Sequence, residues 1–443
     1  MTSAPSKAAI VGCGQRGLKY ALYALDHPEL FQVVAICDPN VSRQEIFLKL
    51  FPQTLDISHV YDDWEKLAVN IDLVNELDIV VICTMDKMHK DPCVTFSNLK
   101  VKGILLEKPM AVNLNDCNEI TKVCVQNDTI FSVCHVLRYS PHNKLIKELI
   151  LNGAIGQVMN ISHTEPMGYI HFAHAFVRGN WKSKDISTFS IMSKCCHDVD
   201  LIRYWLSPYK CKSICSFGSL THFHRKNKPK GAGNAKRCLD CSIKNKCCYN
   251  AEKIYTDPLK KNWAPTNWNP TALIIDKSPT DIEEIDVLNA LKHSDYGKCV
   301  YECENDVCDN QQVLFEFEGG ITANLNMIST TEKRCVRETL VRGSKGEIIC
   351  KSEEVVEVYD FLTRKKKCYN VLDSEQNKPK IKNSRLKGHG YADYFLMSTF
   401  VRAVRENDRT LIHTDALDAL KSHELVFKIE ESRLKGEVVH FYR

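Results

Sequence analysis

Short apolar runs without polar alternation recur through the first 140 residues and are separated by segments of helical spacing. The runs cover residues 8–11, 31–37, 79–83, 103–106 and 130–133, and residues 18–25 show helical spacing. Such runs are typical of parallel strands that helices bury on both faces. We therefore predict a doubly wound α/β domain with a parallel sheet over residues 1–140.

The pattern changes after Pro141. Residues 142–151, 193–206, 391–405 and 414–433 have the periodicity of helices, whereas residues 313–317 and 321–325 alternate apolar and polar side chains. Gly319 and Gly320 join the two alternating runs, which is typical of a β-hairpin. We predict a second domain, residues 141–443, of α+β class with a large, mostly antiparallel sheet. Within it, residues 225–281 are rich in Cys, Lys and Asn, which indicates a surface insertion.

Composition narrows the class of protein. Of the 443 residues, 44% are hydrophobic and 26% are charged, which is typical of a globular chain. The net charge of +4 is spread without a basic stripe, so we expect no nucleic-acid or membrane-surface partner. No run approaches the ~20 apolar residues of a membrane helix, and residues 1–7 lack the apolar core of a secretory signal. Many of the 21 cysteines lie inside apolar runs, as expected for a cytoplasmic protein.

A glycine-rich turn follows the first apolar run, with the sequence Gly12-Cys13-Gly14-Gln15-Arg16-Gly17. Glycines there permit a tight turn, close approach of the backbone to a pyrophosphate, and close helix–strand packing. Asp38 ends the second run, where a carboxylate binds the ribose hydroxyls of NAD and repels the 2′-phosphate of NADP. The pattern predicts a Rossmann dinucleotide site that prefers NAD; Arg43 leaves NADP as the alternative.

Three further stretches follow strands of this predicted domain: residues 84–89, Glu107-Lys108-Pro109, and residues 138–141. Together with the glycine turn they resemble the glucose–fructose oxidoreductase and inositol dehydrogenase (Gfo/Idh/MocA) family. The resemblance covers the first domain and continues through residues 153–156 to His197-Asp198-Val199-Asp200 on a predicted helix.

The resemblance implies an NAD(P)-dependent dehydrogenase whose nicotinamide ring lies between the two domains. Lys108 would bind the reacting hydroxyl and help to move its proton, since partial desolvation lowers the pKa of a lysine toward the working pH. His197 would be the second acid–base group. The positions implied for cofactor contact are Gly12, Cys13, Gly14, Gln15, Arg16, Gly17, Asp38, Thr84, His89, Glu107, Lys108, Pro109 and Arg138.

The chain departs from the family pattern beside His197. Family members usually carry an acid four residues before this histidine, on the same helix face, and here that position is Ser193. A serine cannot tune an imidazole as a carboxylate does. Lys194 could serve as a polar anchor instead, or the proton relay could differ.

Polar side chains that suit a polyhydroxylated substrate gather between residues 165 and 200. The substrate-facing candidates are His171, His174, Arg178, Lys194 and Asp200. For His171 and His174, an ordinary polar loop is the alternative.

The cysteines of the insertion have the spacing of metal ligands. Cys238 and Cys241 are two residues apart, and Cys247 and Cys248 follow. Four thiolates could hold a structural zinc ion and staple the insertion. Because adjacent cysteines rarely bind one ion, Cys299 or Cys303 could supply the fourth ligand; a disulfide and free thiols are the alternatives.

These features predict an oxidoreductase that transfers hydride between NAD(P) and a secondary alcohol or ketone of a sugar, cyclitol or similar polyol. One alternative is a redox-neutral glycosidase or epimerase that uses tightly held NAD. The other is a non-catalytic regulator that senses a dinucleotide or ligand. We expect a homo-oligomer that assembles through the sheet of the second domain.

Overall fold

The first half of the chain folds around a parallel sheet. A computed structural model describes residues 4–260, 269–277, 281–381 and 383–441. Six strands pair in the order β3-β2-β1-β4-β5-β6, all parallel. They are β1 (Ser6–Val11), β2 (Phe31–Cys37), β3 (Val60–Tyr61), β4 (Ile79–Ile82), β5 (Gly103–Leu106) and β6 (Ile130–Val133). The doubly wound parallel sheet predicted from the apolar runs is confirmed, and β3 is the strand that the pattern missed.

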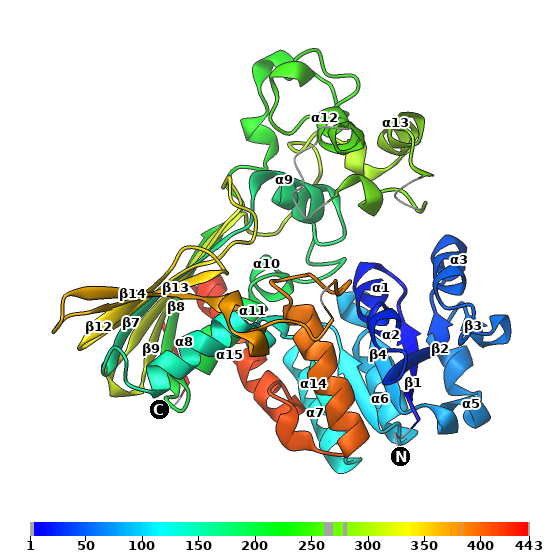
Figure 1. The fold of residues 1–443 in the computed structure, drawn as a ribbon. Helices are drawn as coiled ribbons and strands as arrows, with labels where there is room; N and C mark the ends of the chain where they lie inside the picture. Colours follow the sequence, from blue (N-terminus) through cyan, green and yellow to red (C-terminus); the bar gives the residue numbers. More distant parts are fainter. Residues whose placement is uncertain (1–3, 261–268, 278–280, 382, 442–443) are drawn as a thin grey trace.

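Helices cover both faces of this sheet (Figure 1). They are α1 (Gln15–Ala21), α2 (Tyr23–Asp26), α3 (Val41–Leu50), α4 (Trp64–Ala68), α5 (Ile71–Glu76), α6 (Lys90–Asn98) and α7 (Leu114–Gln126). Successive residues of β1 enter different cores, because side chains alternate across a strand: Ile10 belongs to one apolar cluster and Val11 to the other. Burial on both faces explains why these strands are unbroken apolar runs.

The second sheet has nine strands in the order β14-β13-β12-β11-β7-β10-β9-β8-β15. They are β7 (Val158–Pro166), β8 (Cys211–Ser219), β9 (Asn310–Phe317), β10 (Thr322–Ile328), β11 (Glu338–Gly343), β12 (Gly346–Cys350), β13 (Val355–Asp360), β14 (Lys365–Asn370) and β15 (Val439–His440). Only β7 and β10 pair in parallel; the other neighbours are antiparallel. The predicted hairpin is confirmed, since β9 and β10 join through Gly319 and Gly320, which take φ of 74° and 73°.

Helices of the second half lie between the sheets and on the first sheet (Figure 1). They are α8 (Pro141–Leu151), α9 (Tyr169–Phe172), α10 (Ser190–Ser193), α11 (Cys196–Leu206), α14 (Ala392–Glu406) and α15 (Ala416–Lys435). The single helix predicted over residues 193–206 is wrong at its start, because the helix is interrupted between α10 and α11. None of the helices within the described residues is both long and apolar enough to cross a membrane.

The last two long helices pack against the first sheet although they lie far from it in sequence. A Cβ at Gly103 would stand 2.5 Å from Val404 of α14, and Ala416 and Ala419 of α15 share an apolar cluster with Val11 of β1. The boundary at residue 140 stays a prediction. The second half contributes directly to the core around the first sheet.

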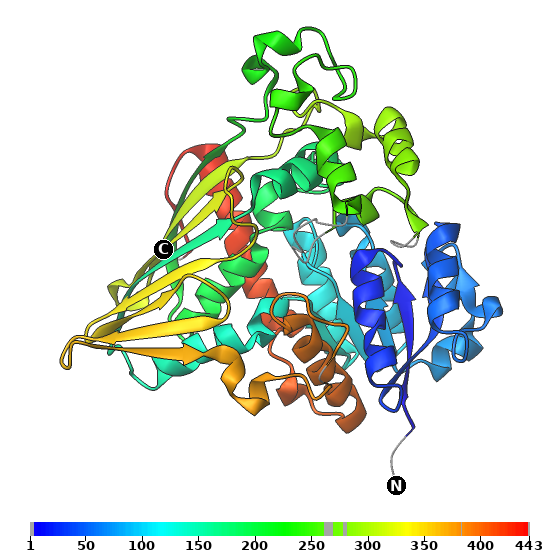
Figure 2. The ribbon, with the colours of Figure 1, turned by 45° about the horizontal axis from the view of Figure 1, so that its top comes forward.

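The predicted insertion is longer than its composition indicated. All residues from 220 to 309 lie between the paired strands β8 and β9, and include α12 (Ala251–Thr256) and α13 (Glu284–His293). Residues 261–268 and 278–280 of the predicted segment lie outside the described residues. The insertion stands at the top of the molecule in both Figure 1 and Figure 2, with α13 near α3. It has a small apolar core of its own, which includes Tyr255 and Leu291.

Candidate cofactor and catalytic site

The glycine turn has the geometry of a pyrophosphate cradle. Gly12 takes a φ of 94°, and a Cβ there would stand 2.5 Å from Cys83 O; a Cβ at Gly17 would stand 2.0 Å from Gly12 O. Both positions therefore exclude side chains. At Gly14 the nearest atom to such a Cβ is Arg43 Nη1 at 3.9 Å, so the space in front of the turn is open. The residues present fit a bound dinucleotide.

Asp38 lies at the carboxyl end of β2, beside the glycine turn. Its Oδ2 accepts a hydrogen bond from Cys13 N at 2.8 Å and its Oδ1 accepts one from Asn40 N at 2.9 Å. Arg43 Nη1 is 3.7 Å away. A carboxylate has about four acceptor sites, so Asp38 keeps capacity for ribose hydroxyls.

Arg16 and Glu107 form an ion pair across the first domain. Arg16 Nε lies 2.7 Å from Glu107 Oε1, and Tyr20 Oη also donates to that oxygen, at 2.7 Å. Burial alone would raise the pKa of Glu107, but Arg16 and Lys108 lower it, so the carboxylate is charged. The Arg16 guanidinium is thus paired with protein carboxylates. This pairing gives no support to the predicted contact between Arg16 and the cofactor.

Lys108 follows β5 and reaches toward the second domain. Its Nζ donates to Ser193 O, at the end of α10, over 2.6 Å, and the Lys108–Pro109 peptide bond is cis. His89 braces this turn, because its Nδ1 lies 2.7 Å from Pro109 O and its Nε2 lies 3.1 Å from Thr84 O. The loops after β4 and β5 are therefore tied together at the carboxyl edge of the sheet, where doubly wound folds bind ligands.

His197 lies in the first turn of α11 near Lys108. It is 7% exposed, and its Nδ1 has no hydrogen-bond partner. Burial, followed by the charge of Lys108, holds the pKa of His197 well below its usual range, so the ring is neutral at neutral pH. Ser193 does not contact this ring: its hydroxyl donates to Phe189 O at 3.3 Å within its own turn.

A buried ionic cluster lies in the second domain next to His197. Lys194 Nζ is 3.2 Å from Glu165 Oε1 and 2.9 Å from Cys335 Sγ, and Arg337 joins Glu165 to Asp198 with contacts of 3.0 and 2.8 Å. Lys194 was predicted to face substrate; in the structure it is 15% exposed and engaged in this cluster.

Of the other substrate candidates, His171 lies near the cluster. Its pKa is held well below the usual range by burial and by the charges of Lys194, His174 and Arg334. The structure therefore brings His171 and Lys194 together on the second-domain side.

Four other predicted residues are buried and paired within the protein, and their predicted contacts with cofactor or substrate stay predictions. Arg138 and Asp200 form a bidentate pair with two contacts of 2.6 Å, and Asp418 and His413 O take the remaining guanidinium nitrogen. No Arg138 nitrogen is left for cofactor, and Asp200 is 1% exposed. A buried charge must be paired, and these two satisfy each other.

His174 and Arg178 anchor the insertion. His174 Nδ1 lies 2.9 Å from Tyr255 Oη, and its ring stacks on Tyr296 with centroids 4.9 Å apart. Arg178 donates to Tyr249 O and Lys298 O, each at 2.8 Å, and is 2% exposed. These side chains contact the insertion from a π-helical turn, Ala173–Arg178, and their predicted contact with substrate stays a prediction.

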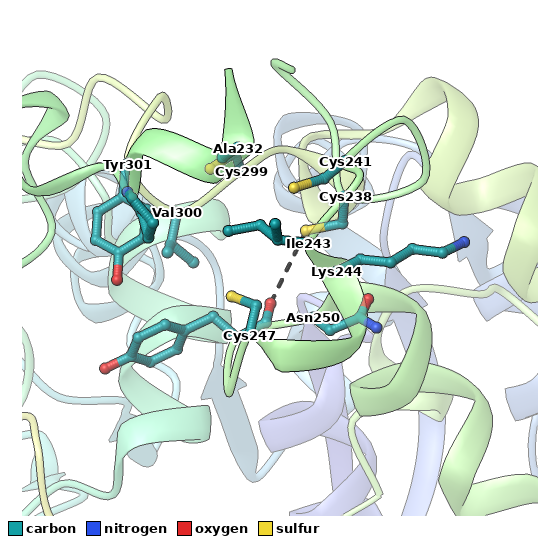
Figure 3. Close-up of a pocket in the computed structure, with 12 residues that line it drawn as sticks. Ala232, Cys238, Cys241, Ile243, Lys244, Cys247, Asn250, Cys299, Val300 and Tyr301 are labelled. Atoms are coloured by element: carbon teal, nitrogen blue, oxygen red, sulfur yellow. Dashed lines mark hydrogen bonds between the residues drawn. The ribbon is translucent and has the colours of Figure 1, made fainter. Parts of the chain in front are cut away.

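The insertion cysteines line a small apolar cavity of about 20 Å³ (Figure 3). Cys238, Cys241, Cys247 and Cys299 contribute to it, whereas Cys248 is exposed and does not. All of these cysteines are free thiols, and no three His, Cys, Asp or Glu side chains within the described ranges are placed to hold a metal. Zinc held by Cys238, Cys241, Cys247 and Cys248 stays a prediction.

Four residues of the site were missed from the sequence: Glu165, Arg337, His389 and Asp393. Asp393 Oδ1 lies 2.8 Å from Arg16 Nη2, and His389 stands with its ring centroid 6.4 Å from that of His197. The one signal was the run Gly388-His389-Gly390 before a predicted helix, which indicates an unusual backbone.

Comparison with known proteins places both halves of the chain. Residues 6–135 match an oxidoreductase family described by its NAD-binding Rossmann fold, and residues 147–440 match the C-terminal alpha/beta domain of the same family. The putative oxidoreductase YteT of Bacillus subtilis is 24% identical over 398 residues, which cover 88% of this chain and 87% of that protein.

Two further likenesses are to proteins with named substrates. The myo-inositol 2-dehydrogenase of Thermotoga maritima is 24% identical over 206 residues, 45% of this chain and 54% of its own length. A levoglucosan dehydrogenase solved with NADH and levoglucosan has a TM-score of 0.69 at 14% identity, covering 99% of this chain and all of that one; at this identity the likeness shows the fold alone. The chain belongs to the Gfo/Idh/MocA family of oxidoreductases, with its NAD-binding Rossmann fold.

Proposed function

We propose that the protein is an NAD-dependent dehydrogenase that interconverts a secondary alcohol and a ketone on a sugar, cyclitol or related polyol. The observation that carries this proposal is the position of the Lys108 amine, which leaves the carboxyl edge of the parallel sheet and meets the second domain at Ser193 O, 2.6 Å away. The named relatives act on inositol and levoglucosan, both polyhydroxylated, which supports this class of substrate.

Each residue of the cleft has a task in such a reaction. Bound NAD supplies the hydride acceptor. Lys108 binds the reacting hydroxyl and takes its proton while passing one of its own ammonium protons onward, and the charged Glu107 carboxylate balances the ammonium beside it. His197, neutral in its buried position, hydrogen-bonds the substrate oxygen without adding charge.

The polar residues around Asp38 support NAD over NADP. Asp38 would accept from the ribose hydroxyls, and Asp276 of the insertion adds a second carboxylate nearby, 3.6 Å from Arg43 Nε. A 2′-phosphate would meet two negative charges and one arginine. We therefore propose NAD as the cofactor.

A second candidate function is a redox-neutral reaction with tightly held NAD. It is favoured by the contact between Asn40 Nδ2 and Asp276 Oδ2 at 2.9 Å, because this contact lays the insertion against the end of the sheet where the ribose would bind. A cofactor covered in this way would leave slowly. Product analysis separates the two candidates, since the redox-neutral reaction accumulates no NADH.

The test is a screen of purified protein against sugars and inositols with NAD⁺ and NADP⁺, followed by absorbance of the reduced ring. Lys108→Met should retain NAD⁺ binding and lose about 100- to 10,000-fold in kcat. Lys102→Met, an exposed lysine at the other end of β5, is the matched control and should behave as wild type. Wild-type protein that binds NAD⁺ and converts no substrate would refute the proposal and favour a sensing regulator.

We also propose that copies of the chain assemble through the outer face of the second sheet. Phe217 and Leu314, on the neighbouring strands β8 and β9, are 65% and 49% exposed. Exposed apolar side chains on adjacent strands favour association. Light scattering of Phe217→Lys against wild type tests this, and an unchanged mass would contradict it.

A further inference from the structure

The loop before α14 places another histidine beside His197. The ring centroids of His389 and His197 are 6.4 Å apart. His389, Gly390 and Tyr391 take φ of 51°, 59° and 67°, three left-handed residues in succession. This conformation is unfavourable for histidine and tyrosine, so surrounding contacts must hold the loop in place.

Asp393, in the first turn of α14, supplies those contacts. Its carboxylate lies 3.5 Å from His389 Nδ1 and 2.8 Å from Arg16 Nη2, and its side chain is fully buried. Gly388 lies so close that a Cβ there would stand 2.0 Å from Asp393 Oδ2. Burial alone would raise the pKa of Asp393, but Arg16 and His389 hold it well below the usual range. The carboxylate is therefore a constant negative charge next to the imidazole of His389.

Two other buried histidines, His197 and His135, lack a carboxylate partner of this kind. His197 is neutral and buried, and the next ring, His135, is fully buried with neither nitrogen hydrogen-bonded. His389 has a side chain that is 36% exposed. It is thus in contact with water on one side and faces His197 on the other.

We propose that His389 and Asp393 form a proton-transfer pair that carries the proton of the reaction between the cleft and bulk water. The inference rests on the proposed dehydrogenase function. Oxidation of a secondary alcohol releases one hydride from carbon and one proton from the hydroxyl oxygen, and the Lys108 ammonium takes that proton as it gives up one of its own. The proton then passes through the His197 ring or a water to the His389 imidazole, which releases it to solvent. Ketone reduction draws a proton from water along the same path.

The groups that face His389 are consistent with this role. Asp393 lies on the following helix with Arg16 behind it, and His197 lies on α11 with Lys108 beyond it. Near Gly390, Glu353 Oε2 is 3.8 Å from the position of a Cβ. The Asp393 carboxylate, 3.5 Å from His389 Nδ1, is placed to hold the imidazole as the proton passes through it.

The test uses His389→Asn in the full chain. Asparagine accepts left-handed backbone and can donate an amide hydrogen bond to Asp393, but it cannot carry a proton. The measurements are kcat, KM and the Kd for NAD⁺ over the pH range in which histidine titrates. His293→Asn, at the exposed end of α13, is the matched control.

We expect His389→Asn to lower kcat about 100-fold with unchanged KM and Kd for NAD⁺. Added imidazole should restore the rate of His389→Asn, because it can carry the proton that the variant side chain cannot. His293→Asn should match wild type. His389→Gln repeats the test if asparagine perturbs the loop.

The outcomes separate the relay from the function on which it rests. If His389→Asn keeps the wild-type kcat, the relay is overturned and the dehydrogenase function stands. A raised KM at unchanged kcat would assign His389 to substrate binding and also overturn the relay. Wild-type protein that converts no polyol would refute the dehydrogenase function itself, and the relay with it.

Discussion

In the first sheet, the polar residues predicted to surround the cofactor lie together at the strand ends, whereas in the second domain the predicted polar residues are buried in contacts within the protein. Asp38 follows β2 and Lys108 follows β5, and parallel topology brings both ends to one edge. In the second domain, Lys194 is paired with Glu165 in a buried cluster next to His171, and Asp200 is buried against Arg138. The parallel topology of the first sheet positions the residues at its strand ends, whereas the need to pair buried charges positions the polar residues of the second domain.

Replacement of Arg138 should have the largest effect on the buried pairs of the second domain. Arg138→Met should lower the free energy of unfolding by about 3–5 kcal/mol, because it leaves the Asp200 carboxylate buried and unpaired. Chemical denaturation measures this loss. The double variant Arg138→Met/Asp200→Leu should recover part of it. A stable single variant with weakened NAD⁺ binding would instead return Arg138 to the cofactor site.

Buried histidines provide a pH test of the same interior. Burial lowers the pKa of His423 to about 3 and that of His142 to about 4. The unfolded chain, with histidine pKa near 6.5, therefore binds more protons below that pH, so stability falls as pH drops from about 6.5 toward 4. At pH 5 each such histidine should lower the free energy of unfolding by about 2 kcal/mol. This pH lies about 1.5 units below the pKa of an unfolded histidine, and each unit corresponds to about 1.4 kcal/mol.

Denaturation at pH 7 and pH 5 measures that loss. His423→Gln should show a smaller difference between the two conditions than wild type does, because one titrating group has been removed. His440→Gln, on the exposed end of β15, is the control and should keep the wild-type difference. Equal stability of the wild type at both values would contradict the neutral, buried histidines.

The proposed contact between Asp38 and the ribose of the cofactor can be tested by substitution. Asp38→Ala should raise the Kd for NAD⁺ about 10- to 100-fold, because the carboxylate's charge-assisted hydrogen bonds to the ribose are lost. The Kd for NADP⁺ should change less, since removing a negative charge favours the 2′-phosphate. Calorimetry measures both constants. Equal losses for the two cofactors would contradict the ribose contact.

The smallest expected effect concerns the insertion. Asp276→Asn removes a charge that faces Arg43 while keeping a side chain that can bond Asn40. Partly exposed pairs contribute about 1 kcal/mol or less, so we expect NAD⁺ to dissociate only a few-fold faster in stopped-flow measurements. Asp281→Asn, also on the insertion, is the control. An unchanged dissociation rate would show that this contact of the insertion does not slow the release of NAD⁺.

Sequence patterns predicted the first half of the molecule better than the second for a physical reason. Unbroken apolar runs and glycines at fixed offsets record the burial and close approach that a parallel sheet requires, so β1, β2, β4, β5 and β6 and the turn at Gly12 were predicted. The second sheet has nine strands, and its edge strand β14 is largely exposed and lacks such a signal.

Site residues could be predicted only where the backbone itself carries the pattern. Arg138 and Lys108 are both basic residues just after strands, and sequence alone cannot tell that Asp200 neutralises the first. Likewise, Asp393 lies 377 residues from its partner Arg16. Pairings over such distances depend on the final packing of α14 against the first domain.

The most direct test of the central claim is a crystal structure of the protein with NAD⁺ and a polyol that it oxidises. We predict that Lys108 Nζ lies about 3 Å from the reacting hydroxyl, between the nicotinamide ring and the second domain. A complex in which this amine points into bulk water, away from the ring, would contradict the account.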